Sequence, residues 1–154
     1  MLRLRIPNAI FIEMVDHARS NAPIEACGIL AGRGRTVERF YPMTNTNASS
    51  DHFLMDPAEQ FAVVKDMRAA GLEMLAVYHS HPQTPARPSR EDMRLALTPG
   101  VLYVILSLQE PARPVLMGYA IENGRADEVL VECTDGSTVQ RIAITAADPG
   151  GRTS

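Results

Sequence analysis

The sequence predicts an α/β or α+β fold in which helices flank a mixed β-sheet. Amphipathic helix patterns alternate along the chain with short apolar runs of strand length. Turn signals, such as Gly34 and Asn123-Gly124, separate neighbouring runs. No repeat and no linker divides the 154 residues, so we expect a single domain over residues 1–140. The remainder, 141–154, is predicted to be a disordered tail.

The first elements are a helix and a β-hairpin. Over residues 7–20, apolar side chains recur at helical spacing. They form one stripe that should pack on the sheet, made by Ile10, Met14 and Ala18 with Phe11 and Val15 beside it. Residues 28–33 and 36–41 are then predicted to pair as a hairpin about the turn at Gly34.

A polar, turn-rich loop at 44–51 leads to a short predicted strand at 53–55 and a second helix. Asp56 is a natural N-cap for this helix, and Pro57 suits its first position because proline has no N–H to leave unpaired. Gly71 should end the helix, since glycine readily adopts the left-handed conformation of a C-cap.

The continuous apolar run at 75–78 predicts a central strand that is buried on both faces. A third helix is expected from Ser89 to about Leu97, before Thr98-Pro99-Gly100 breaks the chain. The remaining strands are predicted at 101–108, 115–121 and 128–133. The last two of these flank Asn123-Gly124, a hairpin-like turn signal within a longer connection.

Composition excludes several classes of function. A hydrophobic content of 45% and a formal net charge of −3 are ordinary for a soluble globular protein. No long uncharged apolar run suggests a membrane span, and no basic block suggests nucleic-acid binding. The N-terminus lacks the apolar core and cleavage site of a secretory signal, so we expect a cytoplasmic protein. Two cysteines, Cys27 and Cys133, do not indicate a disulfide framework.

Two histidines and a carboxylate lie within fourteen residues and predict a metal site. His79 and His81 alternate in an extended segment, so both rings should lie on one face of the strand. Prolines keep 82–88 from being helical, Ser89 is a natural N-cap, and Asp92 then falls in the first helical turn. Two nitrogens and one oxygen would leave the fourth tetrahedral position of zinc open for water, as in catalytic sites.

Glu25 is our candidate for the general base. It stands just before an apolar run, where a carboxylate loses solvation and its pKa rises toward the working pH. Without the rest of the motif, an exposed position in the turn after Pro23 would be the simpler interpretation. Cys27 is best explained as a small buried hydrophobe, with contact to a metal as the lesser alternative.

Together these residues resemble the JAMM metalloprotease family, the active branch of the MPN domains. The family pattern is an upstream glutamate, then His-x-His-Pro, six residues, serine, two residues and aspartate. It is met without insertion or deletion by Glu25, His79, His81, Pro82, Ser89 and Asp92. The resemblance covers residues from about 6 to about 133. It implies a curved, cytidine-deaminase-like MPN sheet sandwiched between helices.

The resemblance also implies the role of each site residue. His79, His81 and Asp92 would bind Zn²⁺. Glu25 would act as the base and later as the proton donor. Ser89 would steady the water or the tetrahedral intermediate, although it could serve only as the N-cap, or do both.

The family's compact prokaryotic members trim or release the C-terminus of ubiquitin-like sulfur carrier proteins. Eukaryotic members often hold ubiquitin with insertions, for which this chain has little room. The resemblance therefore implies a peptidase or isopeptidase acting after the Gly-Gly tail of such a carrier. A narrow groove near zinc would suit that tail, since glycine allows close backbone approach.

Three other functions stay open at this point. The ligand set does not encode peptide specificity, so the chain could hydrolyse or deaminate a small molecule. It could be a noncatalytic MPN scaffold, although those typically lack the ligands present here. It could also store or sense metal. A lone His-x-His is more often two ordinary histidines, but here Pro82, Asp92 and Glu25 accompany it at the family spacing and favour the catalytic interpretation. The sequence does not indicate the oligomeric state or the identity of the carrier.

Overall fold

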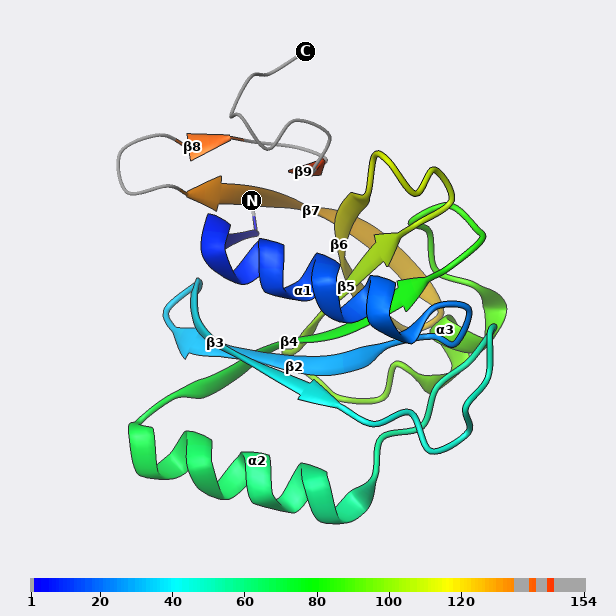
Figure 1. The fold of residues 1–154 in the computed structure, drawn as a ribbon. Coiled ribbons are helices and arrows are strands. Elements are labelled where there is room, and N and C mark those ends of the chain that lie inside the picture. The colour runs from blue at the N-terminus through cyan, green and yellow to red at the C-terminus, as the bar shows by residue number, and fades with distance from the viewer. Residues whose placement is uncertain (1, 135–138, 141–143, 146–154) are drawn as a thin grey trace.

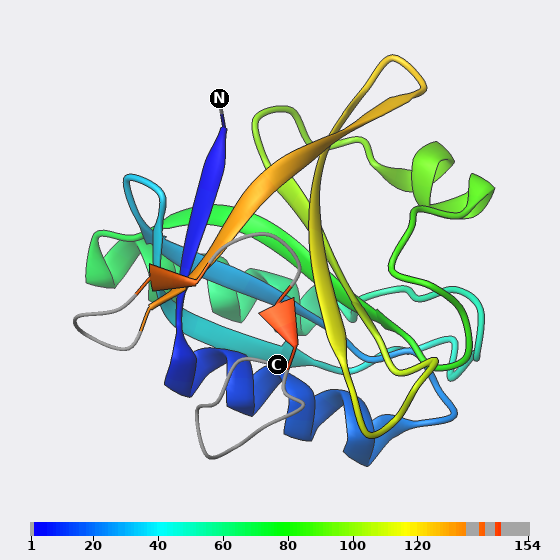
Figure 2. The ribbon, with the colours of Figure 1, turned by 90° about the horizontal axis from the view of Figure 1, so that it is seen from above.

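The computed structural model describes residues 2–134, 139–140 and 144–145. The strands form one sheet in the order β8-β7-β1-β3-β2-β4-β5-β6-β9, and β7 also pairs with β6, so the sheet curves back on itself (Figures 1 and 2). The strands are β1 (Arg3–Pro7), β2 (Cys27–Arg33), β3 (Thr36–Met43), β4 (Glu73–His81), β5 (Leu102–Ser107), β6 (Val115–Glu122), β7 (Arg125–Thr134), β8 (Val139–Gln140) and β9 (Ile144–Thr145). The helices are α1 (Asn8–Asn21), α2 (Pro57–Ala70) and α3 (Arg90–Leu95).

The sheet is mixed, as predicted. Strand β1 runs parallel to β3 and β7, and β4 runs parallel to β5. The hairpins β2–β3, β5–β6 and β6–β7 are antiparallel, as is the pair β2–β4. Helix α1 lies on one face of β2, β3 and β4, between them and β7, while α2 lies on the opposite face (Figure 1). The predicted sandwich of helices about a curved sheet is confirmed.

Helix α1 forms where the sequence predicts it, shifted by one residue. The predicted stripe is buried against the sheet in the main core, with Met14 and Ala18 fully inaccessible to solvent. The apolar stripe therefore fixes how α1 sits on the sheet.

Strand β1 was not predicted. Its side chains alternate: Leu4 and Ile6 are buried in the core, while Arg3 and Arg5 face the other way. Both arginines form ion pairs with the buried Glu132 of β7, at 3.2 and 3.1 Å. This strand joins β3 to β7 and so allows the sheet to curve.

The loop between β3 and α2 contains less strand than predicted. In place of a strand at 53–55 there is one isolated bridge between Asn45 and Met55. Helix α2 has the predicted caps: the Asp56 side chain accepts from the Ala58 N–H, and Gly71 adopts a φ of 71°.

Two boundaries near the C-terminal half also differ. Helix α3 ends at Leu95, two residues earlier than predicted. Strand β7 begins at Arg125, so Asn123 and Gly124, with φ of 50° and 73°, are the whole connection from β6. A two-residue hairpin turn with both φ positive matches the twist of the strands.

The predicted tail at 141–154 lies outside the described residues, apart from the two residues of β9, which pair with β6. Within the part of the chain that the structure describes, no helix is both long enough and apolar enough to cross a membrane.

Candidate metal centre

Strand β4 carries both histidines at its C-terminal end, as predicted. Its neighbours in the sheet are β2 and β5, so the strand is central. The side chains of His79 and His81 are only 3% and 4% exposed and lie on the same face of the strand. Their Nε2 atoms are 3.1 Å apart. Alternation along one strand has therefore brought two imidazoles together.

The N-terminus of α3 supplies the carboxylate. Ser89 is the N-cap, as predicted, and its Oγ accepts a hydrogen bond from the Asp92 N–H at 3.0 Å. In return, Asp92 Oδ2 accepts from the Ser89 N–H at 2.9 Å, which completes a capping box. This reciprocal pair satisfies two backbone donors and fixes the direction of the Asp92 side chain.

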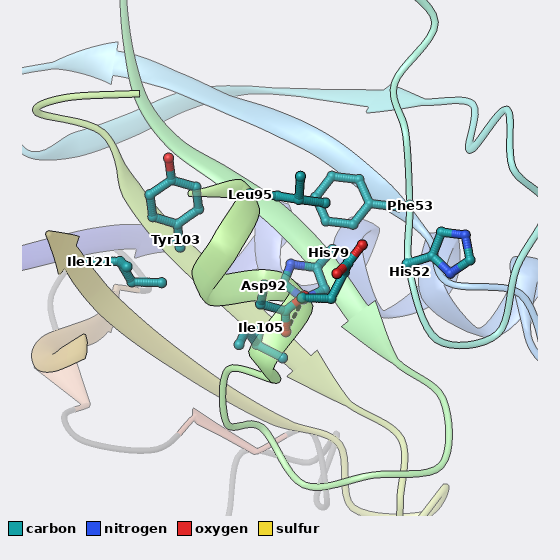
Figure 3. Close-up of a pocket in the computed structure, with 9 residues that line it drawn as sticks. His52, Phe53, His79, Asp92, Leu95, Tyr103, Ile105 and Ile121 are labelled. Atoms are coloured by element: carbon teal, nitrogen blue, oxygen red, sulfur yellow. Dashed lines mark ion pairs between the residues drawn. The ribbon is translucent and has the colours of Figure 1, made fainter. Parts of the chain in front are cut away.

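The three side chains converge on one point. Asp92 Oδ2 lies 3.2 Å from His79 Nε2, an ion pair marked in Figure 3, and 3.0 Å from His81 Nε2. All three possible ligand atoms lie within 4.8 Å of one another. Among the described residues, this is the one group of three or more side chains that could hold a metal ion.

The chemistry of these atoms fits a divalent metal. His81 Nδ1 lies 2.8 Å from the Pro85 carbonyl oxygen, which can only accept, so Nδ1 carries a proton and, in the neutral ring, the lone pair of Nε2 faces the other two ligands. Burial lowers the pKa of His79 and favours the neutral ring that a metal requires. Two imidazoles and one carboxylate are a common ligand set for transition metals.

The charges of Asp92 and the two histidines depend on one another. Burial opposes ionisation of Asp92, yet hydrogen bonds with His79 and His81 hold its pKa well below the ordinary value. Burial likewise opposes protonation of His81, but the hydrogen bonds to Asp92 and the Pro85 carbonyl raise its pKa. The carboxylate is therefore ionised, and a cation is favoured beside it.

Glu25 lies beside these ligands because of strand register. Cys27 pairs with His79, the Ser80 N–H donates to the Ala26 carbonyl at 2.9 Å, and the Ala26 N–H donates to Ser80 Oγ at 2.8 Å. If this antiparallel register continues by two residues, Glu25 falls across from His81, and the charges of His81 and Asp92 both act on its carboxyl.

The Glu25 carboxyl is buried, and one of its oxygens has no hydrogen-bond partner among the described residues. The residue is 2% exposed, and this oxygen is Oε1. Burial raises the pKa of Glu25 to about 8, His81 opposes this rise, and Asp92 adds to it. A carboxyl in this state can take up and release a proton near neutral pH.

One wall of the site comes from the loop before α2. The Phe53 ring stacks on His79, with centroids 4.8 Å apart and an angle of 25° between planes. Figure 3 shows Phe53 beside His79 and Asp92. The cleft next to the ligands is lined by His52, Phe53, His79, Glu91, Asp92, Leu95, Tyr103, Ile105 and Ile121.

The structure separates other candidates from the ligand group. Cys27 is fully buried with its Sγ 4.0 Å from the Met43 carbonyl oxygen, and it is absent from the ligand cluster. His52 lines the cleft but pairs with Asp51 and not with the ligands. Phe53 and the Pro85 carbonyl were not predicted as parts of the site, because stacking and backbone contacts across the fold leave no spacing signal in the sequence.

Comparisons with known proteins place the chain in a family. Residues 7–117 match the family described as prokaryotic homologs of the JAB domain. A CysO-cysteine peptidase of Mycobacterium tuberculosis is 42% identical over 75% of this chain and 80% of its own length. A protein of Thermus thermophilus, named "Probable TtuB-protein conjugate cleaving protease", is 40% identical over 62% of this chain and 64% of its length.

A solved structure is also similar. Protein DSY2949 of Desulfitobacterium hafniense superposes with a TM-score of 0.80 at 46% identity, over 86% of this chain and 93% of that one.

Proposed function

The chain belongs to the family of prokaryotic homologs of the JAB domain, and from this premise we propose that it is a zinc-dependent metallopeptidase or isopeptidase. Its substrate is an amide bond that follows the glycine-rich C-terminal tail of a ubiquitin-like sulfur carrier protein. The resemblance to JAMM enzymes, inferred first from six residues, agrees with the family match.

One observation carries the proposal. The ligand atoms of His79, His81 and Asp92 lie within 4.8 Å of one another. Beside them is the buried carboxyl of Glu25, which is not one of the ligands. Ligands without a base would suit metal storage, and a base without ligands could not carry out metal-assisted hydrolysis. Having both favours metal-assisted hydrolysis over a scaffold.

His79, His81 and Asp92 would hold the ion. Zinc bound there supplies a Lewis acid that polarises the substrate carbonyl and activates water for attack. Glu25 accepts the proton that the water gives up as its oxygen bonds to the carbonyl carbon. Glu25 then delivers that proton to the amide nitrogen as the carbon–nitrogen bond breaks, so a carboxylic acid and an amine leave.

Ser89 would stabilise the developing negative charge on the carbonyl oxygen. Its Oγ accepts from the Asp92 N–H, but a hydroxyl has one hydrogen to donate as well as lone pairs that accept. Capping therefore leaves the hydroxyl hydrogen of Ser89 available for donation.

The lining of the cleft is compatible with a substrate that has small side chains. Apolar side chains, including Phe53, Tyr103 and Ile121, line it beside the ligands. A glycine-rich tail has no side chains to clash with such walls, so its backbone can come close to the metal. The names of two relatives, which refer to CysO-cysteine and to TtuB-protein conjugates, support carrier proteins as the substrate class.

The proposal can be tested by intact mass spectrometry. Ubiquitin-like sulfur carriers extended beyond their terminal glycines are incubated with the zinc-loaded protein. We expect loss of the extension, with cleavage directly after the final glycine, and no loss with Glu25→Gln. Small amides, such as a glycyl anilide, serve as the second substrate. Cleavage of these alone would contradict a carrier-tail peptidase.

A further inference from the structure

Asn45 is a buried polar residue that the proposed mechanism does not use. It is 8% exposed and lies in the loop after β3, where its backbone forms the isolated bridge to Met55. A buried carboxamide is costly unless its polar atoms are paired. The partners of Asn45 therefore indicate its role.

The side chain of Asn45 makes four hydrogen bonds. Its Nδ2 donates to the carbonyl oxygens of Glu25 and His52, each at 3.0 Å. Its Oδ1 accepts from the N–H groups of Asn47 and Leu54, each at 3.1 Å. Two donors and two acceptors are the whole capacity of one such orientation, and the flipped amide would satisfy none of the four.

These bonds join the segment that carries the base to the wall of the cleft. Glu25 precedes β2, and its N–H donates to the Ser49 carbonyl of the same loop at 2.8 Å. The loop thus holds both backbone groups of Glu25. The residues on either side of Phe53 bond to Asn45, and Phe53 itself stacks on His79.

We propose that Asn45 is a positioning residue that fixes the main chain of Glu25 relative to the Phe53 wall across the metal centre. This inference rests on the proposed function, in which Glu25 moves the proton. Asn45 acts through the backbone of Glu25 and touches no reacting atom. Misplacing a catalytic group by about 1 Å can cost on the order of a hundredfold in rate.

Two substitutions and one control separate the parts of this network. Asn45→Asp keeps both acceptors, for Asn47 and Leu54, but replaces the two donors by an acceptor that repels the Glu25 carbonyl. Asn45→Ala removes all four bonds. Thr46→Val is the matched control, because Thr46 Oγ1 donates only to the Leu54 carbonyl in the same loop.

Kinetics on the carrier-tail substrate give the first readout. We expect Asn45→Asp to lower kcat about ten- to hundredfold, with KM changed by less than about threefold and zinc content unchanged. In a Glu25→Gln background the same substitution should cost no further turnover, because the base it positions is gone. Thr46→Val should stay within about twofold of the original chain.

Amide hydrogen exchange of the metal-free protein, followed by NMR, gives the second readout. The Glu25 N–H bonds to Ser49 and not to Asn45. Its exchange rate therefore shows whether losing the Asn45 bond to the Glu25 carbonyl loosens the whole segment. In Asn45→Asp we expect this amide to exchange about tenfold faster or more, while the Leu54 amide keeps its protection. Thr46→Val should leave the Glu25 amide unchanged.

The outcomes are distinct. Faster exchange at Glu25 together with the fall in kcat supports the inference. Unchanged exchange at Glu25 overturns it. The inference also fails if Asn45→Asp lowers kcat by the same factor in the Glu25→Gln background as in the original chain. If the unaltered chain cleaves no carrier tail, the proposed function fails, and exchange at Glu25 alone then decides whether Asn45 positions that segment.

Discussion

The two faces of β4 differ in whether their polar atoms are satisfied. On the side of α1, Tyr78 donates to the Met14 carbonyl, and Ser80 Oγ accepts from the Ala26 N–H. On the side of the cleft, Nδ1 of His79 has no partner among the described residues. His81, two residues along on the same face, has partners for both ring nitrogens, so the unpaired atom of this face of β4 is His79 Nδ1.

The core face of β4 stabilises the fold, and the groups on the cleft face lower its stability. The core face buries Tyr78 completely among the apolar residues of α1 and the sheet. On the cleft face, the Glu25 carboxyl is buried with an unpaired oxygen and a raised pKa. Buried groups without partners are rare in native proteins and concentrate at sites of function.

The largest expected effect comes from removing a ligand on the cleft face. His79→Ala or Asp92→Ala should lose the bound metal and lower turnover to background, because two ligands hold an ion much more weakly than three. Tyr78→Phe, on the core face, should keep both and lose about 1 kcal/mol of stability with its hydrogen bond. Metal analysis and intact mass measure this. Metal retained in His79→Ala would contradict the assigned ligand set.

Glu25→Gln should separate binding from turnover. The amide has the size of the carboxyl but cannot take a proton, so we expect turnover to fall about 10²- to 10⁴-fold while zinc stays bound. Zinc stoichiometry and single-turnover rates are the measurements. Equal zinc loss in Glu25→Gln and His79→Ala would mean that Glu25 is a ligand and not the base.

Ser89→Ala tests a residue that serves both structure and chemistry. Losing the N-cap should cost about 0.5–2 kcal/mol of stability. Losing a donor to the carbonyl oxygen should slow turnover by about a hundredfold. Chemical denaturation and kcat of the folded fraction distinguish the two effects. A variant that is only less stable would leave Ser89 as a cap.

The pH dependence of stability tests the burial of Glu25. Its pKa is about 8 in the folded protein, against an ordinary value of 4.5. Between these values the folded chain binds more protons than the unfolded chain, so the free energy of unfolding should fall as pH rises. The contribution is complete below 4.5 and lost above 8.

The slope from this one group is at most about 1.4 kcal/mol per pH unit. Urea unfolding of the metal-free protein from pH 5 to pH 8 measures it. Glu25→Gln, which cannot ionise, should show a flatter profile and greater stability at pH 8. An identical slope in both proteins would show that the Glu25 carboxyl is not buried as described.

Local patterns predicted most of the elements that build the site. Alternation placed His79 and His81 on one face of a strand, and the capping residue Ser89 placed Asp92 in the first turn of α3. These features depend on residues close in sequence, and the structure confirms their positions. The role of each residue in catalysis remains a prediction.

Strand β1 has a local signal in the sequence, although it was not predicted. Leucine and arginine alternate from Leu2 to Arg5, which is the period of a half-buried strand. The arginines find their partner at Glu132, far along the chain. The alternation predicts a strand, but the sequence does not indicate that Glu132 is the partner of both arginines.

Contacts between distant loops could not be predicted in this way. Asn45 bonds to Glu25, twenty residues earlier, and Phe53 stacks on His79, twenty-six residues later. Neither contact follows a helical or strand period, since each depends on how β2, β4 and the loop between β3 and α2 come together. Such residues need the fold before their roles can be inferred.

The most direct measurement is anomalous diffraction at the zinc absorption edge from crystals of the zinc-loaded protein. We predict one strong peak bonded to Nε2 of His79, Nε2 of His81 and a carboxylate oxygen of Asp92, with the Glu25 carboxyl facing the ion but not bonded to it. A peak elsewhere on the chain, or Glu25 turned away from the ligands, would contradict a hydrolytic centre at the end of β4.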